Sequence, residues 1–99
     1  MGPLAEKHDI TGTLSAPECG GGYDIENASV HIRDESDKLI GSSSTGFDTT
    51  SGAGCEVAFT VRDVPRASFY QIRIGTHDGP SYSHSEMRSA NWDLELALD

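Results

Sequence analysis

Apolar and polar residues alternate along five stretches of this chain. The clearest is CEVAFTVRDV, residues 55–64, in which every second side chain from Cys55 to Val61 is apolar and most of those between are polar. A period of two predicts half-buried strands of an antiparallel sheet. The five stretches are 8–16, 28–34, 55–64, 69–75 and 92–98. The side chains expected to face the core are Ile10, Gly12, Leu14, Ala16, Val30, Ile32, Cys55, Val57, Phe59, Val61, Tyr70, Ile72, Ile74, Trp92, Leu94, Leu96 and Leu98.

The segments between these strands carry turn signals and one weaker strand. KLIGSSST, residues 38–45, alternates less clearly and predicts an edge strand. The acidic run Asp34–Asp37 predicts a hairpin turn, and Pro65 is expected to end the strand before it. HDGP, residues 77–80, predicts another turn, because an Asp-Gly pair is followed by proline.

One segment departs from the alternation. Ser83 stands three residues before Glu86, the spacing of a helix capping box. We therefore expect one short helix near residues 83–90, with Met87 and Ala90 facing the core.

These elements predict an all-β fold, a single antiparallel β-sandwich of six to seven strands with one short helix. Residues 8–99 are expected to form this one domain. Residues 1–7 are expected to be a disordered N-terminal segment or a vector-derived remnant, with any leader or anchor upstream of them.

Charge narrows the choice of partners. The chain of 99 residues has a net charge of −9, and its 7 Lys and Arg residues form no patch. This charge opposes binding to nucleic acid or anionic lipid. No run approaches the roughly 20 apolar residues of a membrane span. Association with a membrane is therefore expected only through a segment outside this chain.

No catalytic motif stands out. The sequence contains no G-x-S-x-G elbow, and nothing singles out one of its 4 histidines as a base. An unfamiliar site built from His77, Asp78 and His84 is the enzyme alternative. We expect no enzyme activity and no cofactor.

The stretch ECGGGYDI, residues 18–25, raises the question of whether Cys19 is reactive. Acidic neighbours and the absence of Lys or Arg within ten residues disfavour a thiolate there. Pairing with Cys55 is the favoured interpretation. Such a disulfide would close a loop of about 37 residues, worth roughly 4 kcal/mol in the chain-entropy model, and would imply an oxidising compartment. The three glycines then form a tight loop rather than a phosphate cradle.

Two sets of residues remain as candidates for binding. Tyr23, Asp24 and Tyr82 lie beside predicted loops and are candidates for contact with a partner. Carboxylates could also hold Ca²⁺, although the spacing of an EF-hand is absent. The candidate calcium ligands are Asp24, Asp34, Glu35 and Asp37.

The chain resembles two groups of proteins. The succession ITGTLSA, IENASVHIRDESDKLIGSSST and CEVAFTVRDVPRASFYQIRI looks like a transthyretin-like, carboxypeptidase-regulatory type of β-sandwich. Domains of this type are usually accessory or adhesive modules without catalysis. The positions that fit its pattern are Ala28, Val30, Thr45, Phe59, Val64, Pro65 and Tyr70.

The second resemblance extends from His8 to Leu98. CGGGYDI, VHIRD, CEVAFTVRDVPRASFY and YSHSEM…WDLELAL are similar to a group of uncharacterised actinobacterial domains that follow a membrane anchor and lie outside the cell. Both cysteines match, which supports the bridge. Relatives commonly carry two aspartates after the tyrosine, whereas only Asp24 stands here, and Val57 replaces a common aromatic residue.

Together these observations predict a non-catalytic extracytoplasmic module that binds a protein or cell-envelope partner through loops at one end. The alternatives are a calcium-stabilised binding domain and an enzyme with an unfamiliar His/Asp site.

Overall fold

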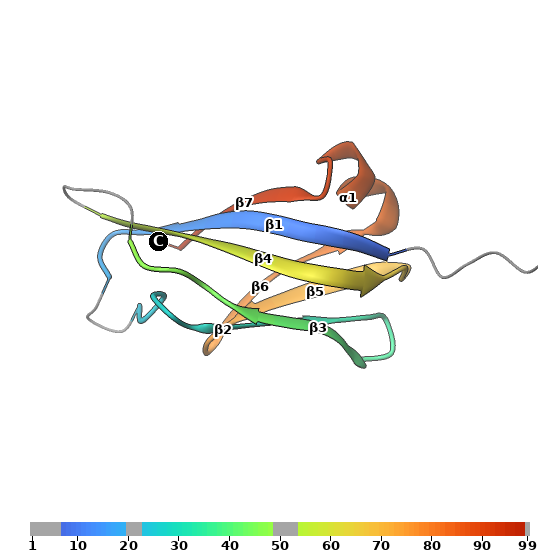
Figure 1. Ribbon diagram of the computed structural model, residues 1–99, viewed down its shortest axis with the longest axis horizontal. Helices are drawn as coiled ribbons and strands as arrows, with labels where there is room; N and C mark the ends of the chain where they lie inside the picture. Colours follow the sequence, from blue (N-terminus) through green and yellow to red (C-terminus); the bar gives the residue numbers. More distant parts are fainter. Residues whose placement is uncertain (1–6, 20–22, 49–53, 99) are drawn as a thin grey trace, which may run out of the picture.

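Strands make up 60% of the described residues and form two sheets, with one short helix beside them (Figure 1). The computed structural model describes residues 7–19, 23–48 and 54–98. The expected all-β sandwich with one helix is confirmed. The first strand begins at Lys7, one residue before the expected boundary, and the segment expected to be disordered otherwise lies outside the described residues.

The first sheet has the strand order β4-β1-β7. Its members are β1 (Lys7–Ala16), β4 (Cys55–Pro65) and β7 (Asp93–Ala97). β1 and β4 are antiparallel, but β1 and β7 are parallel, which departs from the purely antiparallel sandwich that the alternation predicts. The cause is the connection: the chain enters β7 through the helix, at the end where β1 also begins, so both strands run the same way (Figure 1).

The second sheet has the order β3-β2-β5-β6 and is antiparallel throughout. Its members are β2 (Ser29–Arg33), β3 (Leu39–Ser44), β5 (Phe69–Ile74) and β6 (His77–Ser83). β3 lies at an edge, as predicted, and the turn at Asp34–Asp37 joins it to β2, with the N–H of Asp34 donating to the carbonyl of Lys38 at 2.9 Å.

The prediction of a turn at residues 77–80 is wrong, because these residues belong to β6. The turn lies at Gly75 and Thr76, where Gly75 has a φ of 59° that favours glycine. The register between β5 and β6 shifts between Gln71 and Arg73, so Gly79 and Pro80 lie at a β-bulge. A bulge interrupts the alternation, and a strand that carries Gly and Pro at its bulge reads as a turn in the sequence.

The core lies between the sheets and consists of the side chains that the alternation assigns to it. Those of β1, β2, β4 and β5 are all buried as expected. Gly12 leaves room for the ring of Phe59, because a Cβ at Gly12 would overlap that ring. On the last strand the prediction is met only in part. Leu94 is buried, Leu96 and Leu98 are half-buried, and Trp92 precedes the strand with a φ of 59°.

The helix α1 (His84–Ser89) begins with the predicted capping box. The backbone N–H of Glu86 donates to the Ser83 hydroxyl at 3.1 Å, and the Ser83 N–H donates to the Glu86 carboxylate at 2.8 Å. Met87 is fully buried and Ala90 packs against the core, so both face the core as predicted.

The capping box makes the stability of the helix depend on pH. The hydrogen bonds from the Ser83 backbone and side chain lower the pKa of Glu86 below its ordinary value. A carboxylate with a lowered pKa in the folded state stabilises the fold above its unfolded pKa, and this contribution is lost as the pH falls through the folded value. We expect acidification to lower the melting temperature of the wild type more than that of Glu86→Gln, which keeps an acceptor without the charge. Melting curves of both proteins at pH values from neutral to acidic test this, and parallel pH profiles would contradict it.

Candidate functional site

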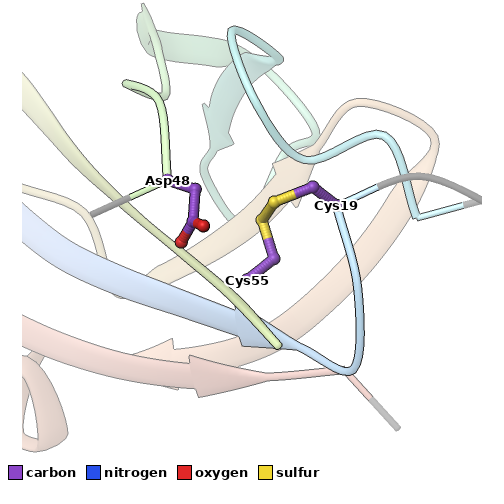
Figure 2. Close-up of side chains that lie close together, drawn as sticks. All are labelled: Cys19, Asp48 and Cys55. Atoms are coloured by element: carbon purple, nitrogen blue, oxygen red, sulfur yellow. A yellow bond between two sulfur atoms is a disulfide. The ribbon is translucent and has the colours of Figure 1, made fainter. Parts of the chain in front are cut away.

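The predicted disulfide between Cys19 and Cys55 is present, with 5.0 Å between the Cα atoms (Figure 2). Cys55 is the first residue of β4 and pairs with Ala16, the last residue of β1. Cys19 follows β1 by three positions. The bond therefore ties the loop after β1 to the adjoining strand. The glycine loop predicted at residues 20–22 lies outside the described residues.

Asp48 lies beside this disulfide (Figure 2). Its carboxylate and the sulfur atoms of Cys19 and Cys55 lie within 4.8 Å of one another, the one such group of potential metal ligands in the described part of the chain. Metal-binding cysteines are thiolates, whereas these two sulfurs are bonded to each other. In the oxidised protein the cluster is therefore a structural joint rather than a metal centre.

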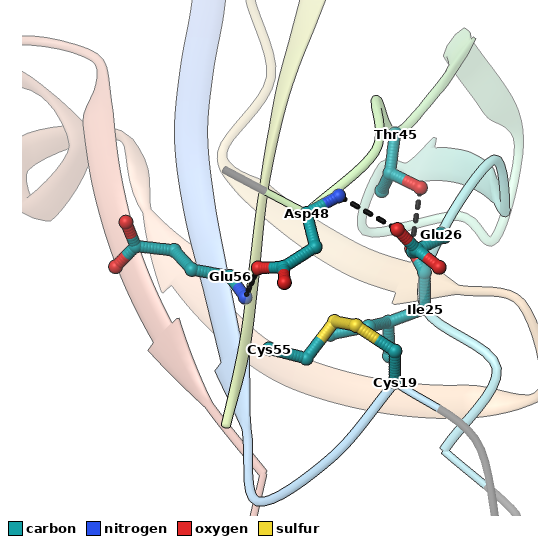
Figure 3. The surroundings of a disulfide bond; sticks show 7 residues. All are labelled: Cys19, Ile25, Glu26, Thr45, Asp48, Cys55 and Glu56. Atoms are coloured by element: carbon teal, nitrogen blue, oxygen red, sulfur yellow. Dashed lines mark hydrogen bonds between the residues drawn. A yellow bond between two sulfur atoms is a disulfide. The ribbon is translucent and has the colours of Figure 1, made fainter. Parts of the chain in front are cut away.

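Asp48 joins two further segments to the disulfide (Figure 3). Its carboxylate accepts from the backbone N–H of Glu56 at 2.9 Å, and its own N–H donates to the Glu26 carboxylate at 2.7 Å. The loop before β2, the loop after β3 and the start of β4 thus meet at the disulfide end of the sandwich.

A second joint lies at Thr45, which is 3% exposed. Its hydroxyl donates to the carbonyl of Ile25 (Figure 3). The same hydroxyl accepts from the N–H of Ala28 at 2.8 Å. Its backbone N–H donates to the Ala28 carbonyl at 2.8 Å. The segment that follows the glycines is therefore bonded to the end of β3. Its residues Asp24 and Asn27 have left-handed φ values of 38° and 49°, which their residue types tolerate.

The structure separates the three candidate partner-binding residues. Tyr23 is half-buried and Asp24 exposed near the β5–β6 turn, where the Tyr23 carbonyl accepts from Nε2 of His77 at 2.8 Å. Tyr82 belongs to β6 rather than a loop and pairs with Tyr70 near the opposite end of that strand. Tyr23 and Asp24 thus share one surface, and Tyr82 belongs to another.

The candidate calcium ligands do not converge. The carboxylate of Asp34 accepts from the N–H groups of Ser36 and Lys38 at 2.8 and 3.0 Å, which closes the turn. Glu35 accepts from the N–H of Ser68 at 2.9 Å, and Asp37 lies 4.0 Å from the Arg33 guanidinium. Asp24 precedes β2, whereas the other three follow it, which separates them by roughly 15 Å at about 3.3 Å per residue.

The residues of the enzyme alternative are also apart. His77 starts β6 and His84 follows its end, so roughly 20 Å of strand lies between them at about 3.3 Å per residue. Asp78 lies 3.6 Å from the Arg73 guanidinium, and Nδ1 of His84 is 2.9 Å from the Tyr70 hydroxyl. The three side chains therefore do not form one constellation.

His84 belongs instead to an aromatic cluster between α1 and the start of β1. His8 stacks on Trp92 at 3.7 Å between ring centroids, and Trp92 meets Tyr70 and His84 edge-on at 5.7 and 5.3 Å. The Tyr70 hydroxyl accepts from the Ala67 N–H at 3.0 Å and lies 2.9 Å from Nδ1 of His84. The cluster packs the helix against the strands.

A groove of about 200 Å³ runs between β6 and β7, on the side of the sandwich away from β3 and β4. Its apolar lining comes from both sheets, and its rim carries polar and acidic residues. The residues that line it with side chains are Leu14, Ile74, His77, Asp78, Pro80, Tyr82, Glu95, Leu96, Ala97 and Leu98. Partial burial, and secondarily the charge of Glu86, raise the pKa of the Tyr82 hydroxyl. The sequence does not reveal this groove, because one of its walls is the strand that reads as a turn.

Fold and geometry thus define a disulfide-bonded, two-sheet β-sandwich with a groove along one side. No family model, curated protein or solved structure matches the chain. Within residues 7–19, 23–48 and 54–98, no helix has the length and apolar character needed to cross a membrane.

Proposed function

We propose that this chain is a non-catalytic module that works outside the cytoplasm and binds a protein or another component of the cell envelope. The observation that carries the proposal is the Cys19–Cys55 disulfide. Structural disulfides persist in oxidising compartments and are rare in the cytosol. The resemblance to anchored actinobacterial domains supports the same location.

The non-catalytic part of the proposal is supported by what the polar side chains do. His77 and His84 each bond to a tyrosine, and the carboxylates of Asp34, Glu35 and Asp48 accept from backbone N–H groups. A general base needs a nucleophile or a substrate position within hydrogen-bond reach. These side chains instead form hydrogen bonds that join loops and strands.

The disulfide end is the proposed contact surface, in keeping with a binding site made of loops. It carries the exposed Asp24 and also Phe47, which is 68% exposed. The residues on both sides of Phe47 are held by hydrogen bonds. The N–H of Gly46 donates to the Ala58 carbonyl at 2.9 Å, and the N–H of Asp48 donates to the Glu26 carboxylate. A large apolar side chain presented on a fastened loop loses little conformational entropy on binding and suits a binding hot spot.

Retention of envelope components on the immobilised, oxidised domain tests the proposal. We expect the wild type to retain a specific component of the source cell's envelope fraction, and Phe47→Ser to lose most of that retention. Phe69→Ser is the matched control, because Phe69 is 51% exposed at the other end of the sandwich. Equal retention by both variants would contradict the assigned surface, and turnover of ester, phosphate or glycoside substrates would contradict the non-catalytic proposal.

A further inference from the structure

The two long sides of the sandwich differ. On one side β3 and β4 approach closely: a Cβ at Gly41 would lie 2.8 Å from the Val61 side chain, and Gly46 donates to Ala58. On the other side β6 and β7 flank the groove, and α1 joins them at one end only (Figure 1). Two edge strands therefore border an apolar groove.

Of these two edges, β6 carries a proline and a β-bulge, which block the addition of another strand. Pro80 has no N–H and lies at a bulge, both of which discourage edge pairing. β7 contains neither proline nor glycine, and its register with β1 is unbroken from Asp93 to Ala97. The edge of β7 is thus regular enough to accept another strand.

The hydrogen bonds to β1 determine which groups of β7 face outward. Thr11 donates to the carbonyl of Trp92, and Leu98 donates to the carbonyl of Ser15. Successive residues of a strand point their backbone N–H and C=O groups to opposite sides. The bonds at Trp92 and Leu98 therefore mean that the backbone groups of Leu94 and Leu96 point toward β1. The groups of Glu95 and Ala97, and the carbonyl of Asp93, point away from the sheet and have no backbone partner within the described residues.

The side chains beside the edge of β7 determine which kind of strand could be added there. A strand added to β7 would point alternate side chains into the groove, beside Leu96, Leu98 and Tyr82. The side chains between them would lie on the outer face, next to the exposed Asp93 and Glu95. A second copy of this chain fits poorly, because pairing β7 with β7 would bring acidic side chains together, and the chain carries a net charge of −9.

We propose that the edge of β7 and the adjoining groove bind an extended segment of a partner protein in which apolar residues alternate with lysine or arginine. The segment adds a fourth strand to the sheet β4-β1-β7. This site is separate from the loop surface at the disulfide end, and neither proposal depends on the other.

Titration calorimetry with an acetylated, amidated peptide of alternating lysine and valine tests this inference. We expect the wild type to bind it and a peptide of alternating glutamate and valine not to bind. Ala97→Pro removes an outward N–H and Glu95→Lys reverses a neighbouring charge, and each should weaken binding by about tenfold or more. Glu56→Lys is the matched control, because it makes the same change in net charge at an exposed side chain of β4. This variant should bind the peptide like the wild type.

Two N-methylated peptides separate strand addition from simple charge attraction. One carries the methyl groups on its lysine amides and the other on its valine amides. Backbone pairing predicts that one loses binding and the other keeps it, because only alternate amides face β7. If Ala97→Pro fails to fold, Glu95→Lys and these peptides still decide the matter.

Three results would overturn the inference: no binding to the wild type, equal binding of both methylated peptides, or a dimer in sedimentation that Ala97→Pro dissociates. None of them would change the retention measured with Phe47→Ser, so failure here is distinguishable from failure of the proposed function.

Discussion

Replacing both Cys19 and Cys55 by serine is expected to lower the free energy of unfolding by about 4 kcal/mol. The bond joins residues 36 positions apart, and cross-linking such a loop reduces the conformational entropy of the unfolded chain. Small domains are stable by only about 5–15 kcal/mol, so this loss is a large share of the total. Urea denaturation of the oxidised wild type and the double variant measures the difference.

The reductant provides the control for this prediction. Reduced wild type should approach the stability of Cys19→Ser/Cys55→Ser, whereas the double variant should be insensitive to reductant. A difference below about 1 kcal/mol between oxidised wild type and the double variant would mean that the loop is fastened mainly by Thr45 and Asp48 rather than by the disulfide.

Thr45→Val is expected to lower the free energy of unfolding by about 2–4 kcal/mol, because it leaves one buried and one part-buried backbone group without a partner. These are the carbonyl of Ile25 and the N–H of Ala28, both bonded to the Thr45 hydroxyl. Valine keeps the shape of threonine, so packing changes little. Urea denaturation gives the loss in stability, and faster hydrogen exchange at Ala28 localises it.

Thr45→Ser is the matched control, since it keeps the hydroxyl and removes only a methyl group. We expect it to retain most of the wild-type stability and the slow exchange of Ala28. Equal losses in the serine and valine variants would show that the methyl group, not the hydroxyl, supports this loop.

The strands with a regular alternation could be predicted because their burial is decided by neighbours in the sequence. In β4 the buried side chains of Val57, Phe59 and Val61 alternate with exposed ones, and the pattern alone identifies the inner face. The capping box is likewise local, since Ser83 and Glu86 are three residues apart.

What the sequence does not reveal depends on contacts between distant segments. β6 is a strand because β5 pairs with it, despite Gly79 and Pro80 at its bulge. The parallel pairing of β7 with β1 follows from the path of the chain through α1, which no period of two can encode. Trp92 reads as the first residue of a strand, but its left-handed backbone places it before β7, where its ring stacks on His8.

The candidate site, like the fold, could be predicted from the sequence only in part. The disulfide could be predicted, because two cysteines fall at the end of one strand and the start of another. Asp48 and Thr45 carry no signal in the sequence for their roles, since both act on residues around 20 positions earlier: Asp48 with Glu26 and Thr45 with Ile25. The groove requires knowledge of both edge strands, and only one of them is apparent from the alternation.

The state of the two cysteines in protein taken from its own cells tests the extracytoplasmic account most directly. Free thiols are alkylated during lysis, the remaining cysteines are reduced and labelled with a second reagent, and mass spectrometry counts each label. If the domain lies outside the cytoplasm, Cys19 and Cys55 will carry only the second label, because they are joined in the cell. If both cysteines carried the first label, this would contradict both the disulfide and the location outside the cytoplasm.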